Sequence, residues 1–250
     1  MSSLIRLACL AVLLGGCHRF PAVVISCAVR WYFRFSLSLR DIEELLLDRG
    51  VVVTYETIRC WCDKFGAGFA KRAKAARRKA GSTWHLDEMF VTLRGEPHLL
   101  WRAVDEHGGE LDVLVQEQRD KAAAKRFFKL VLRSNPVLRK IVTDQLRSYP
   151  AAKADIPELA HVKHVFVKAA ARVNNRAENS HQPTRRRERQ MCGFRDARRT
   201  QAFLSCSGPI RQHFALPRRQ MNAACHRAVL KEGFATWHGW TIAGAIEKII

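Results

Sequence analysis

Three short apolar runs separated by turn sequences constrain the fold of this chain more than any other feature. The runs are rich in aromatic and β-branched residues, as strands are, and they span Trp84–Leu93, Leu99–Asp105 and Leu111–Val115. The sequences between them, Arg94-Gly95-Glu96-Pro97 and His107-Gly108-Gly109, contain the glycine and proline residues that turns favour. The sequence therefore predicts a meander of three strands.

Helices and strands alternate after this meander. Apolar residues at helical spacing predict a helix from Lys121 to Arg133, and Lys140–Thr143 and Val162–Val167 have the composition of short strands. A polar and strongly basic helix is expected from Asn175 onward. This order predicts an α/β domain in which helices accompany a sheet.

The N-terminal part of the chain has a helical pattern instead. Capping and helix-ending residues divide it into three helices. The first is Ala22–Arg34, and the second follows Ser38, with Asp41 as its capping-box partner. The third is Tyr55–Phe65, which Thr54 caps. A helix, a glycine-containing turn and a second helix form the outline of a helix-turn-helix. A small helical bundle used for dimerisation has the same outline, so both interpretations stay open.

The charge of the chain indicates a polyanionic partner. There are 43 Lys and Arg residues against 23 Asp and Glu residues, which is a formal net charge of +20. We expect double-stranded DNA, and the exposed face of the third helix offers Thr57, Arg59 and Lys64 for phosphate and base contacts. Ribosome-associated and membrane-surface proteins can be equally basic, but beyond the first 17 residues no stretch reaches the ~18–20 apolar residues that span a bilayer.

Composition divides the chain into five segments. A run of basic residues from Lys71 to Lys79 holds no large apolar side chain, which indicates a linker or an arm that grips the DNA backbone. The expected segments are a leader over residues 1–17, a helix-turn-helix domain over 18–66, a basic linker over 67–82, an α/β domain over 83–200 and a C-terminal helical tail over 201–250.

The leader and the cysteines bear on localisation. Residues 1–17 resemble a secretion signal, because Arg6 precedes an apolar run from Leu7 to Leu14 that is followed by Cys17. A misassigned start codon would also explain them, and a chain of net charge +20 with DNA as its partner has no use for export. The spacing Cys60-x-Cys62 is too short for the usual zinc hairpin, and no disulfide framework is evident. We therefore expect a cytoplasmic, nucleoid-associated protein.

Three carboxylates stand where an α/β sheet would bring them together. Asp87 lies inside the first apolar run, Asp144 directly follows a strand, and Glu178 lies 34 residues later in the basic helix. Two Mg²⁺ ions about 3.5–4 Å apart need hard oxygen ligands of this kind to cut and join phosphodiester bonds. Each residue also has a structural explanation: Asp87 in a salt bridge, Asp144 as a cap, and Glu178 as a partner of Arg176.

The surroundings of Glu178 favour the catalytic interpretation. Helical spacing predicts that Glu178, His181 and Arg185 share one face of the helix. Cations beside a metal site would hold the phosphates of the scissile strand. We therefore expect Asn175, Arg176, His181 and Arg185 to contact DNA.

These residues resemble the motifs of DDE transposases of the insertion-sequence-six family. The matching motifs are Trp84-His85-Leu86-Asp87-Glu88-Met89, Thr143-Asp144, and Asn174-Asn175-Arg176-Ala177-Glu178 followed by His181 and Arg185. The 34-residue step between the second and third acids also matches the family. The resemblance extends from roughly His18 to Phe234.

The resemblance implies a fold and a reaction. The implied fold is an RNase H-like mixed sheet flanked by helices, preceded by an all-α helix-turn-helix domain. The implied reaction is 3′-end nicking at the terminal inverted repeats of an insertion sequence and strand transfer into target DNA, without a covalent protein–DNA intermediate. Asp87, Asp144 and Glu178 would carry it with Mg²⁺, for which Mn²⁺ can substitute. Because two DNA ends must meet, a homodimer or a larger synaptic oligomer is expected.

Two departures from the family keep alternatives open. Gln145 stands where Lys commonly follows the second Asp, and Pro183 is expected to kink the basic helix and to misaim Arg185. One alternative is a catalytically inactive or regulatory DNA-binding remnant. Another is a nuclease that does not join strands.

Overall fold

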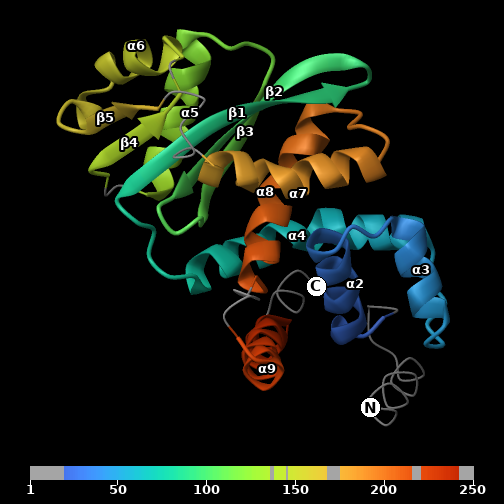
Figure 1. Ribbon diagram of the computed structural model, residues 1–250. Helices are drawn as coiled ribbons and strands as arrows, with labels where there is room; N and C mark the ends of the chain where they lie inside the picture. The colour runs from blue at the N-terminus through green and yellow to red at the C-terminus, as the bar shows by residue number, and fades with distance from the viewer. Residues whose placement is uncertain (1–19, 136–137, 145, 168–174, 216–220, 242–250) are drawn as a thin grey trace. The chain divides into compact units, whose positions relative to one another are not determined.

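The computed structural model describes residues 20–135, 138–144, 146–167, 175–215 and 221–241, without the side chains of residues 175–179 (Figure 1). The predicted leader and Gln145 lie outside these residues. Among the residues that are described, no helix is long and apolar enough to cross a membrane. The chain divides into two compact units, one formed by residues 1–77 and 206–250 and the other by residues 78–205.

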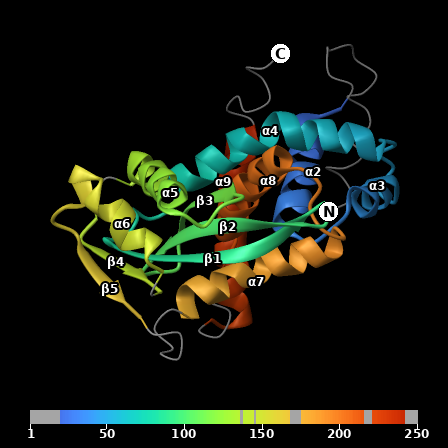
Figure 2. The same cartoon turned by 90° about the horizontal axis from the view of Figure 1, so that it is seen from above.

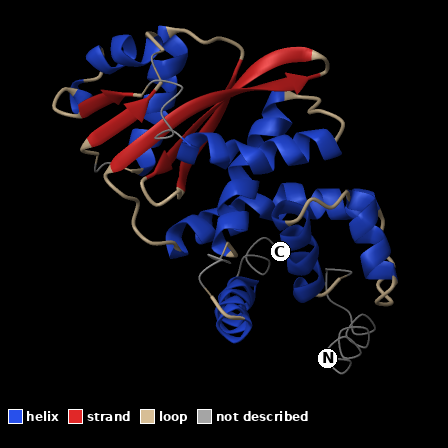
Figure 3. Ribbon diagram, in the orientation of Figure 1, coloured by secondary structure: helices blue, strands red, loops and turns tan. Residues whose placement is uncertain are grey.

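The second unit contains a mixed sheet, whose strands are red in Figure 3. In the described residues its strand order is β3-β2-β1-β4-β5. Its strands are β1 (Thr83–Leu93), β2 (Glu96–Asp105), β3 (Glu110–Gln116), β4 (Lys140–Thr143) and β5 (Lys163–Phe166). The first three strands pair antiparallel, whereas β4 pairs parallel with β1, and β5 pairs parallel with β4. The predicted meander and the two short strands after it are confirmed.

The turn between β1 and β2 is tighter than the sequence analysis predicted. Arg94 and Gly95 have φ angles of 49° and 89°. Two successive residues with positive φ fit a two-residue hairpin turn, whose twist matches that of the flanking strands. β2 therefore begins at Glu96 instead of Leu99, and Pro97 lies near the strand end, where the loss of an amide donor costs little.

Helices cover both faces of this sheet (Figure 2). The helices on one face are α5 (Lys121–Ser134), α6 (Ser148–Ala154) and the short 3-10 helix η2 (Pro157–Leu159). The other face is covered by α7 (Asn175–Gln190) and by the first part of α8 (Ala197–His213).

Two hydrophobic clusters hold the three layers together. On the α5 face, Trp84 and Trp101 pack against Phe127, Phe128 and Tyr149. The cluster on the opposite face combines strand residues with Phe194 and with Leu204 of α8. The strand residues are Met89, Val91, Leu93, Leu100 and Val113. Two faces are buried because successive strand residues point to opposite sides of a sheet. The predicted mixed sheet flanked by helices is confirmed.

The first unit, in its described residues, is built from helices. The helices are α2 (Ala22–Arg34), α3 (Leu39–Leu47), α4 (Tyr55–Ala76), α9 (Ala223–Trp240) and the part of α8 from Cys206 onward. Ser38 Oγ accepts a hydrogen bond from the Asp41 amide at 3.0 Å, and the Asp41 carboxylate accepts one from the Ser38 amide at 2.7 Å. Thr54 Oγ1 accepts from the Thr57 amide at 3.3 Å. The three helix starts and the capping box of α3 are as predicted.

Helix α4 extends beyond its predicted end at Phe65. It runs to Ala76 because Phe69, Ala70 and Ala73 continue the buried stripe of the helix. The Phe69 ring stacks on Trp237 of α9, with 4.3 Å between the ring centroids. The expectation of a linker from residue 67 is therefore wrong for its first ten residues, and residues from Cys206 onward belong to this unit instead of forming a separate tail.

Candidate active site

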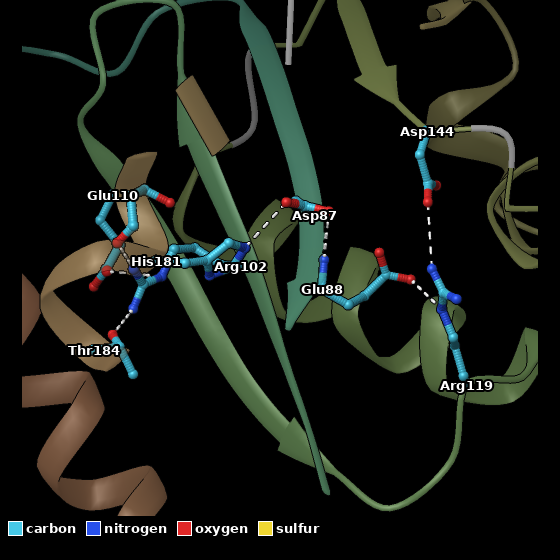
Figure 4. Close-up of polar contacts among 9 residues, drawn as sticks. Asp87, Glu88, Arg102, Glu110, Arg119, Asp144, His181 and Thr184 are labelled. Atoms are coloured by element: carbon cyan, nitrogen blue, oxygen red, sulfur yellow. Dashed lines mark hydrogen bonds and ion pairs between the residues drawn. The ribbon is translucent and has the colours of Figure 1, made fainter. Parts of the chain in front are cut away.

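Asp87 lies on the face of β1 that α7 covers. Its side chain is 16% exposed, and its Oδ2 lies 3.2 Å from Nε2 of His181 on α7 (Figure 4). Asp87 Oδ1 accepts a hydrogen bond from the Glu88 amide at 3.0 Å. The register of the hairpin places Arg102 of β2 directly opposite Asp87. A carboxylate set among apolar strand residues therefore has polar partners, as burial requires.

Asp144 directly follows β4. The parallel register pairs Trp84 with Ile141 and His85 with Val142, so continuing it by two residues brings Asp144 level with Asp87. The Leu146 amide donates to Asp144 Oδ1 at 3.1 Å, which fixes the carboxylate at the carboxyl end of the strand. The side chain is 34% exposed. The sheet thus brings the first two predicted acids to one level of adjacent strands.

Glu178 belongs to α7, and its side chain lies outside the described residues. The helix packs against β1 and β2. His181, which contacts Asp87, follows Glu178 by three residues and is therefore its neighbour on the helix surface. The backbone of the third predicted acid thus lies within one helical turn of a residue that touches the first.

Glu88 and Arg119 belong to this site, and the sequence analysis did not single them out. The Arg119 guanidinium lies between two carboxylates, with Nε 3.1 Å from Glu88 Oε1 and Nη2 3.3 Å from Asp144 Oδ2 (Figure 4). The pKa of Glu88 is raised to about 7, mainly by burial; Arg119 opposes this shift, and the neighbouring Asp144 and Asp87 add to it. Strand alternation from Trp84 could have placed Glu88 on a buried face, but Arg119 had no comparable sequence signal.

His181 is not the exposed phosphate-binding cation that its helical position suggested. Its side chain is 4% exposed, and burial lowers its pKa, an effect that Asp87 opposes. Arg185 is exposed, although its charge also lowers the pKa of His181. His181 is buried because it lies on the side of α7 that packs against the sheet, together with Thr184 and Arg187. Asn175 and Arg176 lie on α7 with side chains outside the described residues.

Arg102 is a buried cation that the sequence analysis missed. Its side chain is 3% exposed, and its Nε lies 3.4 Å from Oε2 of the equally buried Glu110 on β3. Burial lowers the pKa of Arg102, and Glu110 opposes the shift. Its Nη1 donates to the carbonyl of Ser180 and its Nη2 donates to Thr184 Oγ1 at 2.6 Å, both on α7. Arg102 therefore joins the sheet to the helix that carries Glu178.

The predicted DNA contacts of the helical unit lie on α4. Thr57 shares a hydrogen bond of 3.0 Å with Thr54, and Lys64 is exposed. Arg59 has two acidic neighbours on its own helix, Glu56 at 2.7 Å and Asp63 at 3.4 Å. These pairs offset part of the charge that Arg59 would present to a phosphate.

The described donors suit a hard divalent cation. Among the described residues, no group of three or more His, Cys, Asp or Glu side chains is arranged to hold a metal ion, but the side chain of Glu178 is not among them. Carboxylate oxygens such as those of Asp87 and Asp144 are the ligands that Mg²⁺ prefers. Each carboxylate has a nitrogen of His181 or Arg119 within 3.3 Å. The chemistry of these two carboxylates therefore fits Mg²⁺, and the neighbouring nitrogens hold them in place.

The chain is similar to known proteins over most of its length. A family described as a DDE domain matches residues 81–215. The transposase for insertion sequence-like element IS431mec from Staphylococcus aureus is 30% identical over 188 residues, which cover 75% of this chain and 84% of the relative. The transposase for insertion sequence element IS257 in transposon Tn4003, also from Staphylococcus aureus, has the same identity and coverage.

Solved structures show weaker similarity. The catalytic domain of Mos1 mariner transposase aligns with a TM-score of 0.41 at 10% identity, covering 73% of this chain and 93% of that chain. The integrase catalytic core domain of HTLV-2 in complex with magnesium aligns with a TM-score of 0.37 at 14% identity, covering 43% of this chain and 70% of that chain.

Proposed function

Because the chain belongs to the insertion-sequence-six family of DDE transposases, we propose that it binds the terminal inverted repeats of an insertion sequence, nicks their 3′ ends and joins them to target DNA. One observation carries the proposal. Asp87 and Asp144 are level on neighbouring strands, and the helix with Glu178 packs on Asp87 through His181. This arrangement supports a three-carboxylate site open to solvent at Asp144.

In this proposal Asp87, Asp144 and Glu178 hold Mg²⁺, with Mn²⁺ able to substitute. When bound, the ions supply an activated water or 3′-hydroxyl and stabilise the leaving oxygen. The chain's own residues orient the ligands. His181 and the Glu88 amide hold the two oxygens of Asp87, whereas Arg119 and the Leu146 amide hold those of Asp144.

The proposed reaction has two steps, hydrolysis at the end of the element and transfer of that end to the target strand. Water attacks the phosphorus at the end of the element, the bond to the 3′ oxygen breaks, and a free 3′-hydroxyl results. That hydroxyl then attacks a phosphorus of the target strand and displaces the target's own 3′ oxygen. In each step the proton lost by the attacking oxygen is balanced by the proton gained by the departing 3′ oxygen, and no bond between protein and DNA is formed.

The helical unit would recognise the ends of the element. The net charge of +20 favours DNA, and α3 and α4 supply the two helices of a helix-turn-helix, with Thr57, Arg59 and Lys64 on the second. Near the carboxylates, Asn175, Arg176 and Arg185 would hold the scissile strand. Bringing two ends together calls for a homodimer or larger synaptic oligomer, acting on DNA in the cytoplasm at the nucleoid.

An assay with defined products tests this function. The purified chain is incubated with Mg²⁺, labelled element-end DNA and a target plasmid, alongside Asp87→Asn, Asp144→Asn and Glu178→Gln. Joined products that all three substitutions abolish support the proposal. Cleavage without joining would indicate a nuclease, and binding without cleavage would indicate a regulatory or inactive DNA-binding protein.

A further inference from the structure

Pro183 lies inside α7, in the helix that carries Glu178 and His181. A proline in a helix interior removes one backbone hydrogen bond, and its ring crowds the carbonyl four residues earlier, so helices usually kink or break there. The helix nevertheless continues from Asn175 to Gln190. Some other interaction must therefore stabilise the chain on both sides of the proline.

The Arg102 guanidinium contacts α7 on both sides of Pro183. Its Nη1 donates to the carbonyl of Ser180, three residues before the proline. Its Nη2 donates to Thr184 Oγ1, one residue after the proline, and Figure 4 shows this second contact. Arg102 itself is held by Glu110 on the neighbouring strand, and the side chains of Arg102, Glu110 and Thr184 are buried. A planar guanidinium with two fixed donors is suited to bridging two acceptors.

We propose that Arg102 is a positioning residue that braces α7 across Pro183 and so keeps the turn with Glu178 and His181 against Asp87. Arg102 lies directly opposite Asp87 in the hairpin register, so the brace and the first carboxylate share one rigid pair of strands. The positioning of Glu178 for a metal ion rests on the proposed function. The brace itself is a property of the fold that does not depend on DNA or metal.

Substitutions at Thr184 test the brace without removing a buried charge. Thr184→Val removes the acceptor and keeps the shape of the side chain, whereas Thr184→Ser keeps the hydroxyl and serves as the matched control. Arg102→Lys keeps a cation for Glu110 but loses the fork that reaches both acceptors. Each change is also made together with Pro183→Ala, which restores the missing amide donor to the helix.

The first measurement is amide hydrogen exchange of the full chain without metal or DNA. We expect Thr184→Val to speed exchange about tenfold in the α7 amides that precede Pro183, with β1 and β2 unchanged, because a hydrogen bond to a charged group is lost. Thr184→Ser should exchange like the wild type. With Pro183→Ala present, Thr184→Val should have less than about a twofold effect.

The second measurement is Mn²⁺ binding to the DNA-free protein, followed by the loss of the free-ion electron paramagnetic resonance signal. Thr184→Val should weaken binding about tenfold, and Thr184→Ser should restore it. The proposal is overturned if exchange rises equally in α7, β1 and β2, or if Pro183→Ala leaves the effect of Thr184→Val unchanged. If Thr184→Val speeds exchange only in α7 but the wild type binds no Mn²⁺, the brace is supported and the proposed metal site is contradicted.

Discussion

His181 Nε2 lies 3.2 Å from Asp87 Oδ2, so α7 and β1 meet through an imidazole and a carboxylate, both largely shielded from solvent. The contact joins a strand residue to a helix residue far along the chain. Burial lowers the pKa of His181, which favours the neutral imidazole, whereas the neighbouring Asp87 opposes the shift.

The contact between His181 and Asp87 predicts a specific loss in His181→Phe. The ring keeps most of the volume but offers no nitrogen to the carboxylate, so we expect single-turnover cleavage of element-end DNA to slow by about tenfold or more. Binding of the same DNA should stay the same. Gln182→Ala, an exposed neighbour on α7, is the control, and wild-type cleavage by His181→Phe would rule out this role.

The buried pair of Arg102 and Glu110 predicts a large loss of stability in Glu110→Ala. Removing one partner leaves an uncompensated buried charge, which typically costs about 3–5 kcal/mol in the free energy of unfolding. Urea unfolding followed by circular dichroism measures it. The control is Glu117→Ala, whose side chain is 81% exposed and should change the free energy by less than about 0.5 kcal/mol. Equal effects would contradict the assignment of a buried pair.

His164 predicts how stability depends on pH. Its Nε2 lies 2.9 Å from Thr143 Oγ1, and burial, with a smaller effect of Lys153, lowers its pKa from 6.5 to about 4. The unfolded chain therefore binds a proton between pH 6.5 and 4 that the folded chain does not, so stability falls as pH falls through this window. Because His164 is only half-buried, we expect about 1–2 kcal/mol. His164→Gln should flatten this part of the pH profile, and an unchanged slope would contradict the assignment.

The stacking of Phe69 on Trp237 predicts that α4 depends on residues once expected to form a linker. Phe69 is fully buried, so Phe69→Ala should lower the free energy of unfolding by about 3–5 kcal/mol. Thermal unfolding followed by circular dichroism tests this. Val52→Ala, at a position that is 76% exposed, should leave the transition within about 0.5 kcal/mol of the wild type. A mild effect of Phe69→Ala would restore the linker interpretation.

Local patterns accounted for most of the secondary structure. The starts of α2, α3 and α4, the three strands of the meander and the helix after them followed from periodicity, caps and turn residues. The end of α4 was missed because a basic run outweighed Phe69, a single large apolar residue just before it. The start of β2 was missed because Pro97 suggested a turn, whereas positive φ angles at Arg94 and Gly95 close the hairpin within two residues.

The sequence by itself determined the alternation of strands and helices, the family motifs and the positions of Asp87, Asp144 and Glu178 along the chain, because these depend on residue type and spacing. Only the tertiary structure decided what surrounds them. Arg119 reaches Glu88 from 31 residues away, and Arg102 reaches Ser180 from 78 residues away. Such pairings depend on the order of the strands in the sheet and on which side of α7 the sheet buries. Local periodicity does not determine either of these, because both result from contacts between residues far apart in the sequence.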